Sequence, residues 1–138
     1  MKVCLLDAGP LVALFHAGDR FHGHFRQLIL EPEVPVQLHT TWPCVTEASH
    51  LLAPRHRLAL LQWIAAGAVL VYPFDAADLP EMCGWMAQYT RQPRAEMGLA
   101  DASLYRLACE SGVTQIFTVD VRGFSRYRLP DGRGFDIL

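Results

Sequence analysis

Short apolar runs alternate with longer amphipathic stretches along the whole chain, and most runs end at a polar residue or a turn signal. The first run, from Val3 to Leu6, is too short for a helix and is typical of a buried strand in a parallel sheet. It stops abruptly at Asp7, and Gly9 and Pro10 then break the strand. Further strands are predicted over residues 34–41, 68–74, 115–119 and 135–138.

Helical patterns lie between these runs. Capping residues and prolines in first turns place their starts, and Gly67 and Gly112 mark two of their ends. Helices are predicted over residues 10–16, 20–30, 42–52, 54–66, 75–90 and 99–111, with loops at 91–98 and 122–134. This order predicts a three-layer α/β/α sandwich with a mainly parallel central sheet of four to five strands. We expect a single domain over residues 1–138.

Composition narrows the class of protein. The chain is 51% hydrophobic and 19% charged, which is the globular range. The net charge of −2 provides no overall basic field for nucleic acid. No apolar run approaches the roughly 18 residues that span a bilayer, so we expect no membrane segment. The four cysteines form no C-x-x-C pair and predict reduced thiols in a cytoplasmic protein rather than a zinc site.

Four acids stand in apolar surroundings. Asp7 and Asp120 each follow a predicted strand, while Glu47 and Asp101 lie near the beginnings of two predicted helices. Taken singly, the three aspartates are explained by turns or helix caps. Taken together, two strand ends and two helix beginnings can meet at one edge of a parallel sheet, where ligands bind in such folds. We therefore expect the four carboxylates to converge.

Converging carboxylates favour a cation, because their charges repel each other unless they are protonated or neutralised. Oxygen ligands without a His or Cys partner suit Mg²⁺ or Mn²⁺, one or two ions per site. Such a pocket can activate water for displacement at phosphorus. Arg122, Arg126 and Arg128 are suited to hold an RNA backbone. An ordinary solvated tail is the other interpretation of this arginine cluster.

The residues in this order resemble a known family. Its pattern is matched by Leu6-Asp7, Val45-Thr-Glu47, Leu99-Ala-Asp-Ala-Ser103 and Phe117-Thr-Val-Asp120, followed by Phe124 and Arg128. The sequence is similar to PIN domains, and most similar to the VapC-type toxins of bacterial toxin–antitoxin pairs.

This resemblance implies a Mg²⁺- or Mn²⁺-dependent endoribonuclease whose metal-binding quartet is Asp7, Glu47, Asp101 and Asp120. Thr118 matches a position that supports the last acid, and Ser103 is a possible supporting residue in a helix first turn. A cognate VapB-like antitoxin and a homodimer are the implied partners. Faces around residues 12–15 and 51–64 could receive either one, or pack in the core.

The chain also departs from that family. Ala8 stands where Ser or Thr is common, and Met97 and Gly98 stand where many members carry a further acid, for which Glu96 could substitute. These departures favour an alternative: a PIN-like RNA-binding or scaffold module with weak or no catalysis. A phosphoacceptor receiver domain is a third possibility, but it needs a lysine late in the sheet, and Lys2 is the only lysine.

The aromatic residues have two interpretations as well. Trp42, Trp63 and Trp85 could stack on RNA bases, but tryptophans at helical positions more often belong to the core. Scattered histidines, His39 among them, are expected to be surface or core residues rather than ligands.

Overall fold

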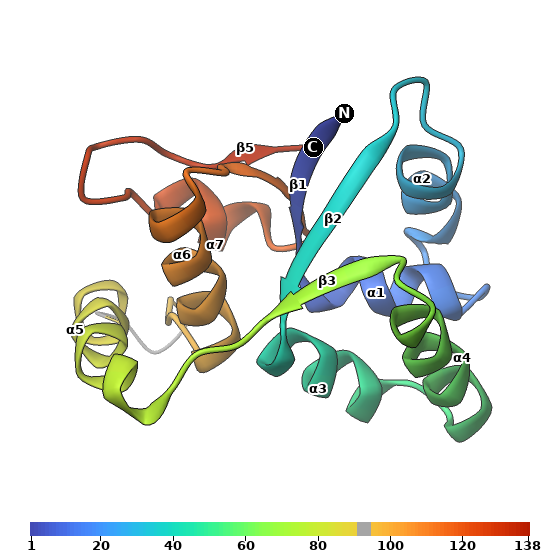
Figure 1. The fold of residues 1–138 in the computed structure, drawn as a ribbon, viewed down its shortest axis with the longest axis horizontal. Helices are drawn as coiled ribbons and strands as arrows, with labels where there is room; N and C mark the ends of the chain where they lie inside the picture. Colours follow the sequence, from blue (N-terminus) through green and yellow to red (C-terminus); the bar gives the residue numbers. More distant parts are fainter. Residues whose placement is uncertain (91–94) are drawn as a thin grey trace.

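Five parallel strands form one sheet in the order β3-β2-β1-β4-β5 in the computed structural model, which describes residues 1–90 and 95–138 (Figure 1). The strands are β1 (Lys2–Leu6), β2 (Val36–Thr41), β3 (Val69–Tyr72), β4 (Gln115–Phe117) and β5 (Asp136–Ile137). The predicted α/β class and parallel sheet are confirmed. The part of the predicted loop 91–98 that covers residues 91–94 lies outside the described residues.

Helices cover both faces of this sheet. Those of the first half are α1 (Ala8–Phe15), α2 (His22–Phe25), η1 (Arg26–Leu30), α3 (Trp42–Leu51) and α4 (Pro54–Ala65). Those of the second half are η2 (Ala76–Asp78), α5 (Leu79–Tyr89), α6 (Leu99–Ser111) and α7 (Val121–Arg126). In Figure 1 the first set lies to one side of the strands and α5, α6 and α7 lie to the other.

Strand β1 explains the two layers. Cys4 and Leu6 belong to the core under α1 and α4, whereas Leu5 belongs to the core under α5 and α6. All three side chains are fully buried, as expected for a central strand of a parallel sheet that is covered on both faces. Helix α3 lies across the end of the sheet: Val45 packs into the first core and Cys44 into the second.

Two predicted elements differ from the structure. The loop predicted over 122–134 contains helix α7, because Asp120 caps it by accepting a hydrogen bond from the Gly123 amide at 3.0 Å. The helix predicted over 20–30 begins later, at His22, and continues without a gap from α2 into η1, which is π-helical. Asp19 accepts from the Phe21 amide at 2.8 Å just before α2. Glycine and arginine within residues 122–126 conceal the apolar spacing that normally signals a helix.

The topology has a switch point at the carboxyl ends of β1 and β4. The chain builds outward from β1 through β2 to β3, then crosses to add β4 and β5 on the other side of β1. The order of strands therefore reverses between β1 and β4, and ligands bind at such switch points in open α/β sheets. Among the described residues, none of the helices has the length and apolar composition needed to cross a membrane.

Candidate functional site

Asp7 lies at the switch point and is the most buried of the four predicted acids, with 6% of its surface exposed. Its Oδ1 accepts the Ala8 amide at 2.8 Å, which caps α1, and its Oδ2 accepts the Thr118 hydroxyl at 2.7 Å. Burial raises the pKa of Asp7, the two hydrogen bonds oppose this rise, and the nearby charges of Glu47 and Asp120 add to it. Strands β1 and β4 are therefore joined at their ends through Asp7 and Thr118.

Asp101 lies in the first turn of α6 and is partly buried. Its Oδ2 accepts the hydroxyl of Tyr127 at 2.6 Å. Burial raises the pKa of Asp101 to about 7; the Tyr127 hydrogen bond opposes that rise, and the charges of Asp7, Asp120 and Glu47 add to it. The carboxyl group of Asp101 is thus within electrostatic reach of all three other acids.

Asp120 and Glu47 are exposed to solvent. Asp120 follows β4, and two hydrogen bonds hold it in position. Its amide donates to the Thr118 hydroxyl at 3.0 Å, and its carboxylate caps α7 by accepting from the Gly123 amide. A Cβ atom at residue 123 would overlap the Asp120 carboxylate, so only glycine fits there. Glu47 extends from α3.

The four predicted acids therefore lie near enough to one another for their charges to interact. No group of three or more His, Cys, Asp or Glu side chains within the described part of the chain is already arranged as a metal cage. The chemistry of the donors nonetheless suits a hard divalent ion, because all four are carboxylates and two have raised pKa values. Each carboxylate oxygen has two acceptor sites, so one that accepts a hydrogen bond can still bind an ion.

A network of small polar side chains supports this edge from below. The hydroxyls of Thr41 and Ser103 lie 2.6 Å apart, and Ser103 also donates to the Ala100 carbonyl at 2.6 Å. The Cys44 thiol lies 3.9 Å from Asp7 Oδ1, and burial raises its pKa above the usual range. Thr118 thus contacts Asp7 directly, whereas Ser103 contacts Thr41 and the Ala100 carbonyl. Roles for Thr41, Cys44 and Tyr127 were not predicted from the sequence.

The three arginines separate into two groups. Arg122 and Arg126 line a hollow of 440 Å³ together with Glu96, Asp120 and Gly123. The Arg128 guanidinium instead donates to the carbonyls of Ser125 and Tyr127, both at 2.8 Å. Arg126 also donates to the Tyr89 carbonyl at 3.3 Å. Positive charge therefore lies beside Asp120, and Glu96 shares the same hollow.

Comparison with known proteins supports the fold. No protein-family model matches the sequence, and no match was found among curated proteins. The structure is similar to the crystal structure of VapC20 from Mycobacterium tuberculosis, a toxin that cleaves the sarcin-ricin loop. The TM-score is 0.71 at 19% sequence identity, and the match covers 83% of this chain and 87% of VapC20.

The fold is that of a VapC-type PIN domain. In this PIN fold, Ala8 begins α1 and is buried, with 4% of its surface exposed. Met97 is also buried, with 2% exposed, whereas Glu96 is exposed beside Asp120. Ala8 and Met97 are therefore core positions next to the acids, whereas Gly98 is exposed.

Proposed function

We propose that this protein is a cytoplasmic endoribonuclease that depends on Mg²⁺ or Mn²⁺ and acts as the toxin of a toxin–antitoxin pair. The main support is the convergence of Asp7, Glu47, Asp101 and Asp120, whose charges are all felt at Asp101. The VapC-type PIN fold adds to this support, because VapC20 itself is an RNA-cleaving toxin.

Each of the four acids has its own place in the proposed metal site. Asp7 and Asp101 would hold one or two ions at the switch point, with Glu47 and Asp120 completing the set from the solvent side. A divalent ion bound there supplies the positive charge that favours attack of water on phosphorus. Thr118 and Tyr127 keep Asp7 and Asp101 in position through their hydrogen bonds.

The arginines beside Asp120 would hold the RNA backbone. Arg122 and Arg126 face the hollow that contains Asp120, so a phosphate there would be shared between a basic and an acidic wall. Contacts of this kind set affinity and register more than sequence preference.

A second protein is part of the proposal. Helices α3 and α4 expose Leu51, Leu58 and Leu61, with 63%, 59% and 39% of their surfaces accessible. We propose that an antitoxin segment or a second copy covers this apolar stripe, since exposed patches of this kind mark interaction sites. Co-expression with the product of the neighbouring gene, followed by purification, checks the antitoxin.

Cleavage of RNA by single-residue variants tests the nuclease. We expect Asp7→Asn and Asp101→Asn to lose at least about a hundredfold in cleavage rate, since even second-shell changes at metal sites cost 10–100-fold. Chelation of divalent ions should have the same effect on the native protein. The substrate is bulk cellular RNA, and fragments are followed by gel electrophoresis.

The matched control is Glu33→Gln, which removes an exposed acid just before β2, at the opposite edge of the sheet. It should cleave as the native protein does. Equal cleavage by Asp7→Asn, Asp101→Asn and the native protein would contradict the proposed function.

A further inference from the structure

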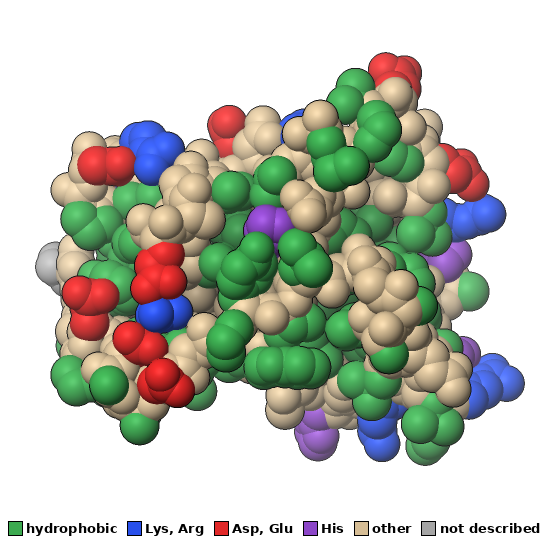
Figure 2. Space-filling model, viewed as in Figure 1, with side chains coloured by type: hydrophobic (Ala, Val, Ile, Leu, Met, Phe, Trp, Pro, Cys, Tyr) green, Lys and Arg blue, Asp and Glu red, His purple; other side chains and the backbone are tan. Residues whose placement is uncertain are grey.

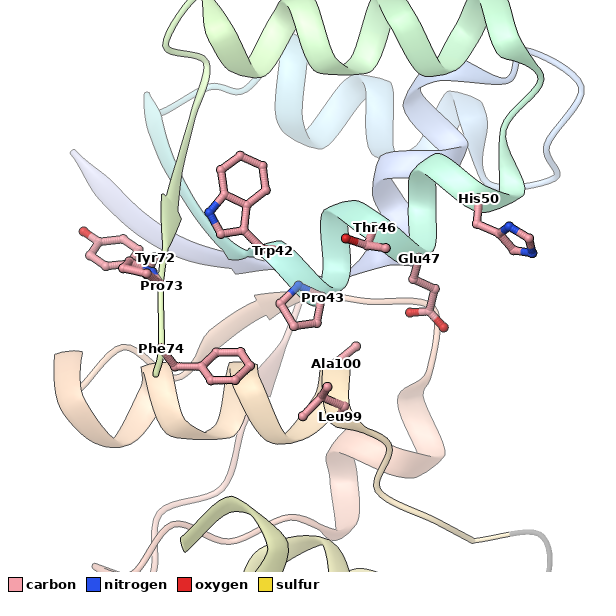
Figure 3. A pocket seen from close by; sticks show the side chains of 10 residues that line it. All are labelled: Trp42, Pro43, Thr46, Glu47, His50, Tyr72, Pro73, Phe74, Leu99 and Ala100. Carbon is pink, nitrogen blue, oxygen red and sulfur yellow. The ribbon is translucent and has the colours of Figure 1, made fainter. Parts of the chain in front are cut away.

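An apolar pocket opens directly beside the carboxylates. It lies between the start of α3, the segment that follows β3 and the start of α6, and it has a volume of 680 Å³ (Figure 3). Glu47 belongs to its wall, and Leu99 and Ala100, which precede Asp101, form another part of that wall. In Figure 3 the carboxylate of Glu47 hangs from α3 on the side of Leu99 and Ala100. The pocket therefore borders the cluster of acids at Glu47.

Aromatic rings dominate the rest of the pocket. Trp42 and Tyr72 are exposed by 52% and 36%, and the ring of Phe74 points toward Leu99 and Pro43 (Figure 3). Figure 2 shows hydrophobic side chains gathered over β3 and the start of α3 on this face of the molecule. No Lys or Arg is among the described residues that line the pocket. The lining thus favours a flat, uncharged group over a phosphate.

Trp42 differs from the other two tryptophans. Trp63 packs edge-on against Phe15 at 5.4 Å, and Trp85 packs against Tyr105 at 4.6 Å, each beside one of the two cores. Trp42 is the first residue of α3, and 52% of its surface is exposed to solvent. Packing of the core therefore explains Trp63 and Trp85 but leaves Trp42 available for a ligand.

The position of the pocket relative to the arginines indicates what this ligand is. Glu47 faces the apolar pocket, while Asp120 faces the hollow that contains Arg122 and Arg126. The carboxylates thus separate an aromatic wall from a basic one. A nucleic acid strand has the matching composition, since each phosphate carries a flat base beside it.

We propose that this pocket binds an unstacked base of single-stranded RNA next to the phosphate that is cleaved, with Trp42 as the stacking surface. This inference rests on the proposed function and adds the base-binding part of the same site. Phe74 and Tyr72 complete the apolar walls, and the Thr46 hydroxyl and His50 supply polar groups at the rim. Stacking of this kind tolerates every base, so the pocket selects unpaired over paired RNA.

Binding measurements with and without bases test the pocket. The probes are a short fluorescein-labelled single-stranded RNA of mixed sequence and an abasic ribose-phosphate chain of the same length. All proteins carry Asp7→Asn. If the nuclease proposal is right, this substitution prevents cleavage of the probe; if it is wrong, the substitution leaves binding by the pocket unchanged. Affinity is measured by fluorescence anisotropy in Mg²⁺, and tryptophan emission is recorded in parallel.

We expect Trp42→Ala to weaken binding of the RNA roughly tenfold, the usual effect of losing one stacked base. Binding of the abasic chain should not change. RNA should also quench tryptophan emission in the parent protein. It should not do so in Trp42→Phe, because the remaining Trp63 and Trp85 pack beside the cores, away from the pocket. Trp42→Phe retains an aromatic ring and should recover most of the affinity.

Leu70→Ala is the matched control, because Leu70 is exposed by 42% on β3 but does not line the pocket. It should bind RNA as the parent does. Equal losses for the RNA and the abasic chain, equal losses in Leu70→Ala and Trp42→Ala, or no RNA binding at all would overturn the inference. A dimer in light scattering that dissociates on Trp42→Ala would overturn it too, since a second copy would then occupy the pocket.

The two proposals fail separately. If Trp42→Ala binds RNA as tightly as the parent while the native protein still cleaves RNA, only the base pocket is contradicted. A base-dependent effect of Trp42 without any metal-dependent cleavage contradicts only the nuclease.

Discussion

Asp7 and Asp101 are shielded from solvent, whereas Glu47 and Asp120 are exposed, although all four carboxylates belong to one cluster. Burial raises the pKa of both members of the first pair, and each of them needs a buried hydroxyl as a partner. The second pair instead faces the two hollows where substrate would lie. Under the proposed function this is a division of roles, with an inner pair that would hold the cation and an outer pair that would meet the RNA.

The cost of the inner pair is electrostatic. A carboxylate in a dry setting favours its protonated form unless a positive charge is close. Without a cation, the folded protein therefore has to keep Asp101 partly protonated near neutral pH or accept a loss of stability. Glu47 and Asp120 have no such electrostatic cost, because water solvates their carboxylates.

Asp101→Asn should show the largest effect on the stability of the metal-free protein. The pKa of Asp101 is raised from 3.8 to about 7, so the folded state binds more protons than the unfolded state across that interval. Stability is consequently lost as pH rises from about 4 to about 7, and the loss stays constant above it. After allowance for partial exposure, we expect Asp101→Asn to be more stable by roughly 2 kcal/mol near pH 8.

Thermal unfolding with a chelator, followed by circular dichroism, measures this difference. The gain should disappear at about pH 3, which lies below the pKa of Asp101 in both states. The difference in stability between the two proteins does not contain the contribution of His39. Burial lowers the pKa of His39, so its contribution to stability changes with pH in the opposite direction. Asp120→Asn is the control: it retains the cap on α7 and should change stability little at either pH. A larger gain in Asp120→Asn than in Asp101→Asn would reverse the proposed division.

The outer framework of this site could be predicted from local patterns. Strand-end and helix-start acids are visible in the sequence, because a short apolar run followed by Asp is itself the signal, and parallel topology then brings such ends together. The boundaries of α6 were predicted for the same reason, since Gly112, at φ 75°, stops a regular amphipathic stretch.

The supporting residues could not be predicted, because their roles depend on distant packing. Tyr127 donates to Asp101 across 26 positions, and its segment reads as a loop until Asp120 caps α7. Trp42 has the same local pattern as a core tryptophan, yet 52% of its surface is exposed in the folded protein. Exposure is a property of the assembled layers rather than of sequence periodicity.

Tyr127→Phe should have a smaller effect on the inner pair. It removes the hydroxyl that stabilises the ionised form of Asp101, so the pKa of Asp101 should rise further. We expect a several-fold loss of cleavage near neutral pH, on the order of 1 kcal/mol for one hydrogen bond, and a pH profile displaced upward. Tyr105→Phe is the control, because its buried hydroxyl donates to the Arg128 carbonyl and not to the acids. Identical pH profiles for the two variants would mean that Tyr127 acts only in packing.

Arg122→Gln should have the smallest effect, and it probes the outer pair. Arg122 shares a hollow with Asp120, so it would contact an RNA phosphate rather than a base. Removing one phosphate contact should reduce the slope of log affinity against log salt by about 1 or less and weaken all RNA sequences alike. Anisotropy with the labelled RNA at several salt concentrations measures both quantities.

Arg133→Gln is the matched control, since Arg133 is exposed and pairs with Asp131 at 2.8 Å instead of lining the hollow. Its salt slope should equal that of the native protein. If Arg122→Gln also leaves the slope unchanged while Trp42→Ala still weakens RNA binding, the strand would approach from the aromatic wall alone. Asp120 would then have the same role that we propose for Asp7, as a ligand of the cation, and the inner and outer acids would differ only in solvent exposure.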